Sequence, residues 1–244
     1  MSQKTVICMK WGTRYGPEFV NRLYGGVIRN ITGPLRFICF TDDKTGLSQG
    51  IEIQPLPRIN LPEAYQWTPW RKLSCWQYPL ADLEGDILFL DIDLIVVGSL
   101  DDLFAYAPGE YCVIENWTQK GRGIGNTSAY RFPAGKYEQL FEIFDANPDQ
   151  VLGECGIEQQ YISKYIPNQR FWPAEWCLSY KHDLVPRFPL NWLKPPVLPA
   201  DARIIAFTGR PDPDEARAGQ WQAPWYKKFY KHAKPASWID EHWR

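Results

Sequence analysis

The first forty residues follow a strand–helix–strand pattern. Segments 5–9 (TVICM) and 36–40 (RFICF) are short runs of β-branched and aromatic residues, which is typical of buried strands. Segment 18–31 lies between them, and its apolar residues at helical spacing are Phe19, Leu23, Val27 and Ile31. Thr32-Gly33-Pro34 follows and ends the helix. Two strands joined by a helix at this spacing predict a βαβ unit and therefore a parallel sheet.

The rest of the first two thirds continues this alternation. We expect a strand at 87–97 (ILFLDIDLIVV), strands at 110–115 and 126–132, and helices at 71–83, at 135–146 and from about Ile157. The strands are apolar at successive positions, as expected where helices cover both faces of a parallel sheet. The fold class is thus α/β, with a mostly parallel central sheet flanked by helices.

After residue 166 the texture changes, because Pro and Trp become dense in FWPAEW, FPLNWLKPPVLP and APWYKKFY. We interpret this part as a loop-rich C-terminal tail on a single domain spanning 1–244, with 1–166 as its α/β part and 167–244 as its loop-rich part. The six cysteines form no CxxC pair or Cys/His cluster, and two of them lie inside apolar strands, so we expect buried free thiols.

Composition mainly excludes partners. The formal net charge is −1, so no global positive field favours nucleic-acid binding. The longest apolar stretch carries two acids and is not expected to span a bilayer, and the N-terminal apolar run is too short for a signal peptide. We therefore expect a cytoplasmic protein without a transmembrane segment. Its 12 tryptophans in 244 residues are an unusual surplus.

Asp91-Ile92-Asp93 is the strongest candidate for chemistry. A second D-x-D at Asp212-Pro213-Asp214 shows that the bare pattern is not specific, but Asp91 and Asp93 have four apolar residues on either side. In an extended chain the two carboxylates would project to the same face and need a cation, for which hard oxygen ligands suit Mg²⁺ or Mn²⁺. At the carboxyl end of a parallel strand this predicts a metal–diphosphate site. The alternative is that the strand ends at Leu90 and the two acids cap a solvated turn.

These residues also resemble a known family. Segments 70–76 (WRKLSCW) and 85–104 (GDILFLDIDLIVVGSLDDLF) are similar to the glycogenin and bacterial galactosyltransferase type of glycosyltransferase, which has the nucleotide-diphospho-sugar transferase (GT-A) fold. Shorter similarities follow in the same order along the chain, at 6–16, 126–128, 156–159 and 207–211. The resemblance implies a hexosyltransferase that takes a nucleotide-diphosphate sugar, UDP-linked by expectation, and retains the anomeric configuration. Its acceptor would be a carbohydrate or glycoconjugate hydroxyl. We expect 1–166 to bind the nucleotide and the Trp-rich loops of 167–244 to lie on the acceptor side, where they would offer flat apolar faces to a sugar.

The resemblance also implies roles for individual residues. Those expected to bind the nucleotide or its diphosphate are Trp11, Thr13, Tyr15, Lys72, Asp91, Gly209 and Arg210. Those expected beside the transferred sugar are Asn126, Glu158 and Gln159. Asp91 and Asp93 would hold the Mn²⁺ or Mg²⁺ ion. Structural alternatives stay open, with Lys72 as an exposed helical lysine, Glu158 as an acid at a helix N-terminus, and Trp11 or Tyr15 in the core.

The chain departs from the family pattern in the late diphosphate loop. Metal-dependent members place a His three residues before the loop glycine, where this chain has Ala206, and a Lys three residues after it, where this chain has Asp212. If the loop is shifted, the ligand position is Thr208, again not His. The third protein ligand to the metal is therefore missing or supplied elsewhere.

Other functions remain open. A haloacid-dehalogenase-like phosphohydrolase also has an apolar strand ending in D-x-D, with Asp91 as the nucleophile, but there the motif opens the domain. A non-catalytic nucleotide-sugar or carbohydrate-binding protein fits the missing His, and a scaffolding role is a further alternative.

Overall fold

The computed structural model describes residues 3–244, which form two compact units. The first unit contains residues up to 20 together with 32–92 and 102–172, and the second contains 21–31, 93–101 and 173–244. The expected division of the chain at residue 166 stays a prediction.

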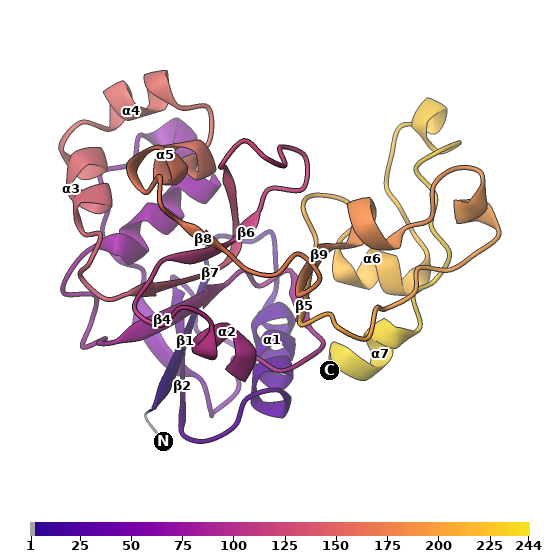
Figure 1. The fold of residues 1–244 in the computed structure, drawn as a ribbon, viewed down its shortest axis with the longest axis horizontal. Helices are drawn as coiled ribbons and strands as arrows, with labels where there is room; N and C mark the ends of the chain where they lie inside the picture. Colours follow the sequence, from indigo (N-terminus) through magenta and orange to yellow (C-terminus); the bar gives the residue numbers. More distant parts are fainter. Residues whose placement is uncertain (1–2) are drawn as a thin grey trace. The chain divides into compact units, whose positions relative to one another are not determined.

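A seven-stranded sheet forms the centre of the first unit (Figure 1). Its strands are β1 (Lys4–Lys10), β2 (Leu35–Thr41), β3 (Glu52–Pro55), β4 (Asp86–Leu90), β6 (Cys112–Glu115), β7 (Gly125–Pro133) and β8 (Arg170–Phe171), in the order β3-β2-β1-β4-β7-β6-β8. β3, β2, β1 and β4 are parallel to one another, whereas β7 runs antiparallel to both β4 and β6. The expected α/β fold with a mostly parallel central sheet is thus confirmed.

Short helices accompany this sheet: α3 (Gln139–Ala146), α4 (Pro148–Glu154), α5 (Glu158–Tyr165) and the 3₁₀ helices η1 (Glu63–Tyr65) and η2 (Pro69–Trp76). A continuous apolar core lies between the sheet and η2, α3 and α5. At its centre the Trp76 ring stacks on Tyr130, with centroids 5.4 Å apart and planes 3° from parallel, and Tyr130 stacks in turn on Phe89 at 4.8 Å. Part of the tryptophan surplus is therefore core packing.

The expected βαβ start of the chain is confirmed. Helix α1 (Pro17–Arg29) joins β1 to β2, which pair in parallel with Cys8 opposite Cys39. The expected helix at 71–83 is wrong in type and length, because the segment forms the 3₁₀ helix η2 and ends at Trp76. Pro79 follows three residues later and has no N–H to continue a helix. All six cysteines are buried free thiols, as expected.

The expected continuous strand at 87–97 is wrong. β4 ends at Leu90, Ile92 and Asp93 form a turn, and β5 (Leu94–Val96) begins a different sheet. The apolar residues on both sides are buried, but they belong to two sheets and not to one strand. Asp91 and Asp93 therefore do not share one face of an extended strand, contrary to the expectation from the sequence.

The second unit contains a three-stranded sheet in the order β5-β10-β9, with β10 (Ile204–Ala206) antiparallel to β5 and parallel to β9 (Cys177–Ser179). Its other elements are the π-helix η3 (Tyr180–Leu184), the 3₁₀ helices η4 (Leu190–Trp192) and η5 (Trp225–Lys227), and the helices α6 (Pro213–Ala218) and α7 (Trp238–His242). Asp212 accepts from the backbone of Glu215 as the N-cap of α6, while the Glu215 side chain accepts from the backbone N–H of Asp212. The second D-x-D is thus a helix cap.

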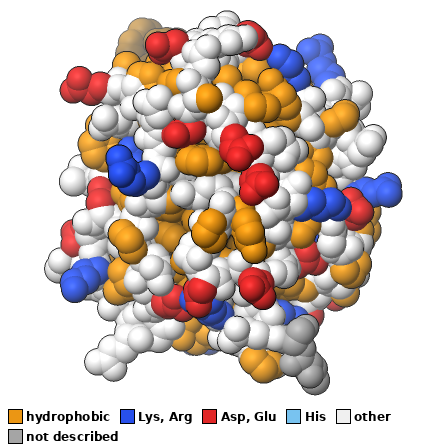
Figure 2. Space-filling model, turned by 90° about the vertical axis from the view of Figure 1, so that its left-hand side faces the viewer, with side chains coloured by type: hydrophobic (Ala, Val, Ile, Leu, Met, Phe, Trp, Pro, Cys, Tyr) orange, Lys and Arg blue, Asp and Glu red, His pale blue; other side chains and the backbone are white. Residues whose placement is uncertain are grey.

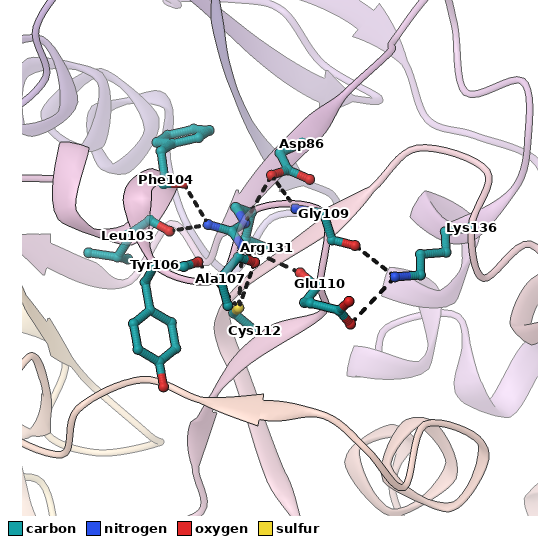
Figure 3. A network of polar contacts seen from close by, with 10 residues as sticks. All are labelled: Asp86, Leu103, Phe104, Tyr106, Ala107, Gly109, Glu110, Cys112, Arg131 and Lys136. Carbon is teal, nitrogen blue, oxygen red and sulfur yellow. Dashed lines mark hydrogen bonds and ion pairs between the residues drawn. The ribbon is translucent and has the colours of Figure 1, made fainter.

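Arg131 on β7 is completely buried and organises the end of α2 (Asp101–Ala105), as Figure 3 shows. Its guanidinium donates to the carbonyl oxygens of Leu103, Phe104 (2.9 Å) and Ala107, and its Nε lies 3.6 Å from Asp86 Oδ2. Carbonyls at a helix C-terminus carry partial negative charge, so a buried cation is stabilised there.

Figure 2 shows one face of the molecule, on which basic and acidic side chains are interspersed with apolar ones and no single sign dominates. Along residues 3–244, no helix combines the length and apolar character that crossing a membrane requires.

Candidate functional site

The neighbouring parallel strands β2, β1 and β4 bring polar residues to one edge of the first unit's sheet. β2 ends at Thr41, β1 at Lys10 and β4 at Leu90, so the residues that follow them share the carboxyl edge. In open α/β sheets this edge is where ligands bind. Asp91 comes directly after β4, and its backbone N–H donates to Ser128 O on the adjacent β7 (2.8 Å).

Lys72, Asp91, Thr127 and Glu158 form a buried polar cluster at this edge, called here the Lys72 cluster. Lys72 Nζ lies 2.6 Å from Asp91 Oδ1 and 2.7 Å from Asp91 Oδ2, and it donates to Thr127 O (3.3 Å). Lys72 is only 5% exposed, so the alternative that it is an exposed helical lysine is wrong. Because these acceptors occupy the donors of its ammonium group, direct contact with a phosphate requires that one of these bonds be exchanged.

Glu158 completes the cluster from the first residue of α5. Thr127 Oγ1 donates to Glu158 Oε1 (2.6 Å), and Glu158 is 2% exposed. Burial raises the pKa of the Asp91 carboxyl, Lys72 opposes this rise, and the negative charge of Glu158 adds to it. Lys72 thus pairs with Asp91, and the neighbouring Glu158 carboxyl accepts from Thr127, in a region of low solvent access where electrostatic interactions are strong. The helix-N-terminus reading of Glu158 is also correct, since α5 begins there.

Asn126 and Gln159 lie beside this cluster but have structural partners of their own. Asn126 is opposite Ile114 where a β-bulge interrupts the β6–β7 pairing, and its Oδ1 accepts from the Ser128 N–H (3.0 Å). Gln159 Oε1 accepts from Asn116 Nδ2 (3.1 Å). The bulge changes the direction of the start of β7, where Asn126 lies. The two hydrogen bonds hold the amides of Asn126 and Gln159 in fixed orientations. Their contact with a sugar stays a prediction.

The turn after β1 carries the residues expected at the nucleobase. Trp11 is half-buried against the core, Thr13 is exposed, and the Tyr15 ring lies 4.6 Å from Phe19. Trp11 and Tyr15 thus each have a packing partner, and stacking on a base stays a prediction.

Gly12 fixes the geometry of this turn. It adopts φ +64°, and its N–H donates to Asp42 Oδ2 (3.0 Å). A Cβ on Gly12 would lie 2.6 Å from the ring of Trp67, a side chain that is 68% exposed. Only glycine suits both the positive φ and this close approach.

In the second unit, Gly209 and Arg210 precede α6. Gly209 adopts φ +76°, and Arg210 Nη1 lies 2.5 Å from Glu215 Oε1 and 3.1 Å from Asp212 Oδ2. The acidic N-cap of α6 thus holds the Arg210 guanidinium, although its side chain is 44% exposed. Asp212, found where the family has a Lys, has a structural role as this cap.

The residues fit a resident metal ion only in part. Asp91 offers a carboxylate, but both of its oxygens are paired with Lys72. Over residues 3–244 no group of three or more His, Cys, Asp or Glu side chains is arranged to hold a metal. Neither candidate position for the third ligand is a histidine. Ala206 is buried in β10, and the carbonyl oxygen of Thr208 accepts from Lys181. The metal site at Asp91 and Asp93 stays a prediction.

Thr127, Asp42 and Trp67 are not among the site residues that the sequence predicts. The position of Thr127 between Asn126 and Ser128 in a strand-like segment could have indicated it, and so could the position of Asp42 directly after the second expected strand. No local pattern indicates Trp67, because its approach to Gly12 joins segments that are distant along the chain.

Comparisons with known proteins agree with the fold. Solved structures that match include the galactosyltransferase LgtC in complex with donor and acceptor sugar analogs, at TM-score 0.59 and 14% identity, over 86% of this chain and 88% of that chain. The glycosyltransferase GlyE of Streptococcus pneumoniae TIGR4 matches at TM-score 0.60 and 15% identity, over 86% of this chain and 56% of that chain. No family model and no curated protein sequence matches. At these identities the likeness shows a shared fold, which is that of the GT-A glycosyltransferases.

Proposed function

We propose that the protein is a glycosyltransferase that moves a sugar from a nucleotide-diphosphate sugar to a hydroxyl acceptor. The expected donor is a UDP-sugar. The observation that carries this proposal is the Lys72 cluster at the carboxyl edge of a sheet whose fold glycosyltransferases share. Breaking the bond between the anomeric carbon and the diphosphate oxygen leaves the electron pair on the diphosphate. The sugar becomes positively charged and the leaving group negatively charged, so both signs need local partners.

The Lys72 cluster supplies both a negative and a positive side chain for these developing charges. The Glu158 carboxylate would stabilise developing positive charge on the sugar, while Lys72 would hold Asp91 in place and reduce the negative potential that the diphosphate meets. The acceptor hydroxyl then attacks the anomeric carbon and gives its proton to solvent or to the leaving diphosphate. Fixed positions matter because reacting atoms must be aligned. Asn126 and Gln159 are proposed to position the sugar, with retention of configuration.

The nucleotide is proposed to bind at the turn of Trp11, Thr13 and Tyr15 in the first unit. The expected contact of Gly209 and Arg210 with a diphosphate stays a prediction from the resemblance. Trp67 is added as a further aromatic contact, because it is exposed and lies against Gly12. Aromatic faces suit a nucleobase, since base–aromatic stacking contributes about 1–3 kcal/mol per base.

A non-catalytic nucleotide-sugar-binding protein is the second candidate. It is favoured by the incomplete metal ligand set and by the ion pair that occupies Asp91. In this case the same groups would recognise the donor without transferring its sugar.

One experiment separates the two candidates. The protein is incubated with UDP-glucose or UDP-galactose, with and without Mn²⁺, while free UDP and the thermal unfolding midpoint are followed. Release of UDP, by transfer or by slow hydrolysis, supports the transferase. A higher midpoint without UDP release supports the binding protein, and phosphatase activity without any nucleotide effect contradicts both.

A further inference from the structure

Two loops of the second unit expose an unusual amount of apolar surface. Segments 188–197 and 225–230 are called here the aromatic surface. Its most exposed side chains are Trp225 (84%), Val197 (71%), Leu193 (69%), Phe229 (65%) and Tyr226 (59%). Large contiguous apolar surfaces on a folded protein mark interaction sites.

The two segments lie side by side and are held in place. The rings of Phe188 and Phe229 have centroids 4.6 Å apart, and Trp192 Nε1 donates to Phe229 O (2.9 Å). Asn191 is 1% exposed, and its Nδ2 donates to Tyr230 O (3.1 Å) and His232 O (2.8 Å). The segments belong to the orange and yellow loops of the second unit in Figure 1. Because a buried amide anchors them, the aromatic surface is a constructed feature of the fold.

The segments that carry this surface are basic. Segments 184–200 and 216–239 contain seven Lys or Arg and no Asp or Glu, and one of the seven, Arg217, is paired with Asp240 just beyond them. Lys227 and Lys228 stand between the exposed aromatics, and Lys231 is close enough to Lys181 to help burial lower the pKa of that lysine. The face in Figure 2, in contrast, mixes both signs. This basic charge would complement an anionic partner.

A cavity of about 500 Å³ adjoins the aromatic surface. Its lining includes Trp192, Trp221, Lys228, Lys231 and His232. Trp192 and His232 stack with centroids 3.8 Å apart, and the buried Nε1 of Trp221 has no hydrogen-bond partner among the described residues. Two lysines and aromatic walls suit a phosphate-bearing head group.

We propose that the aromatic surface docks the protein on a membrane that contains anionic phospholipid. Trp225, Phe229 and Leu193 would enter the interface between head groups and acyl chains, where amphipathic aromatics are enriched. Lys227, Lys228 and Lys231 would face the lipid phosphates, at about 1 kcal/mol for each lysine. A bilayer is favoured over a peptide because the surface combines broad apolar exposure with basic charge. The inference does not depend on glycosyl transfer.

The test is co-sedimentation of the full chain with vesicles of phosphatidylcholine alone or mixed with phosphatidylglycerol. We expect binding to the anionic vesicles only, weakened by salt and accompanied by a blue shift of tryptophan emission. The triple variant Lys227→Gln/Lys228→Gln/Lys231→Gln should bind about a hundredfold more weakly. Trp225→Ser/Phe229→Ser should lose the emission shift. Lys44→Gln/Lys120→Gln and Ile143→Ser are matched exposed controls on the first unit and should bind normally.

Several outcomes overturn the proposal. They are absence of binding to anionic vesicles, undiminished binding by the triple variant, and sedimentation of the wild type without vesicles, which would make the surface an interface between copies. If inorganic phosphate displaces the protein from the anionic vesicles, the cavity binds a free anion, and this result would overturn the membrane assignment. Circular dichroism of each variant checks that the fold is intact.

Discussion

Lys72 Nζ lies 2.6 Å from one carboxylate oxygen of Asp91 and 2.7 Å from the other, although the two residues are 19 positions apart in the sequence. The ion pair is largely shielded from water, with side-chain exposures of 7% and 19%. Removing one partner from a buried pair leaves an uncompensated charge, which costs about 3–5 kcal/mol. The pair therefore makes the candidate site sensitive to either substitution.

Lys72→Met should lower the free energy of unfolding by about 3 kcal/mol and abolish UDP release from UDP-sugars. The reason is that Asp91 then lacks its cation while it remains close to the negative charge of Glu158. Urea unfolding and UDP release measure the two effects. Lys136→Met removes an exposed lysine from the same unit and should leave both unchanged.

The double variant Lys72→Met/Asp91→Asn separates stability from function. It leaves neither charge of the pair unmatched, so stability should largely return while activity stays lost. Activity in the double variant would contradict a role for this pair at the site.

Glu158→Gln should leave the fold intact, because the amide oxygen can still accept from Thr127 Oγ1. The loss of negative charge beside the proposed sugar position should lower the rate of UDP release about a hundredfold. Steady-state kinetics measure this, with Glu154→Gln on the exposed part of α4 as the control. An unchanged kcat would remove Glu158 from the proposed site.

Asp93→Asn should abolish any Mn²⁺-dependent tightening of UDP binding and leave the thermal unfolding midpoint nearly unchanged. The expectation rests on the D-x-D pattern, which pairs Asp93 with Asp91. Calorimetric titration with UDP in the presence of Mn²⁺ or of EDTA measures it. If the variant binds UDP and Mn²⁺ as the wild type does, the metal site is not at Asp93.

Arg131→Met should destabilise the first unit by about 3–5 kcal/mol, because Asp86 and the carbonyls at the end of α2 lose their cation. Hydrogen exchange should report opening of residues 103–112 first. Arg122→Met changes an exposed arginine and should have little effect. Equal stability of the two variants would contradict the organising role of Arg131.

Stability at acid pH should depend on Glu52. Its hydrogen bonds from Arg36 lower its pKa, so the stabilisation is present above the unfolded-state pKa of about 4.3 and is lost as pH falls through the lower folded-state value. Glu52→Gln should therefore cost about 1 kcal/mol at neutral pH and almost nothing once the carboxyl is protonated. Urea unfolding across this pH range measures the difference, and a cost independent of pH would contradict it.

Much of the fold could be predicted because its signals are local. The apolar runs at β1, β2 and β6 and the helical spacing of α1 depend only on residues close together in sequence. The length of η2 was less predictable, since apolar spacing alone does not distinguish a 3₁₀ helix from an α-helix.

The end of β4 at Leu90 is the alternative that the sequence left open, and the surrounding residues do not decide it. Burial makes the residues before and after the turn equally apolar, whether they continue one strand or enter two sheets. Hydrophobic pattern reports burial, and it does not report which neighbouring strand does the burying. For the same reason the sequence predicts a metal ion as the cation of Asp91, whereas in the structure Lys72, 19 positions away, pairs with it.

The placement of the tryptophans divides the protein's intrinsic fluorescence into two classes. Trp76 is 2% exposed and stacked on Tyr130, so it should emit at short wavelength and couple to its neighbour in the near-ultraviolet circular dichroism. Trp225 is 84% exposed and should emit at long wavelength and be quenched by iodide or acrylamide. Buried tryptophans such as Trp76 and exposed ones such as Trp67 and Trp225 can therefore be followed separately in one unlabelled sample.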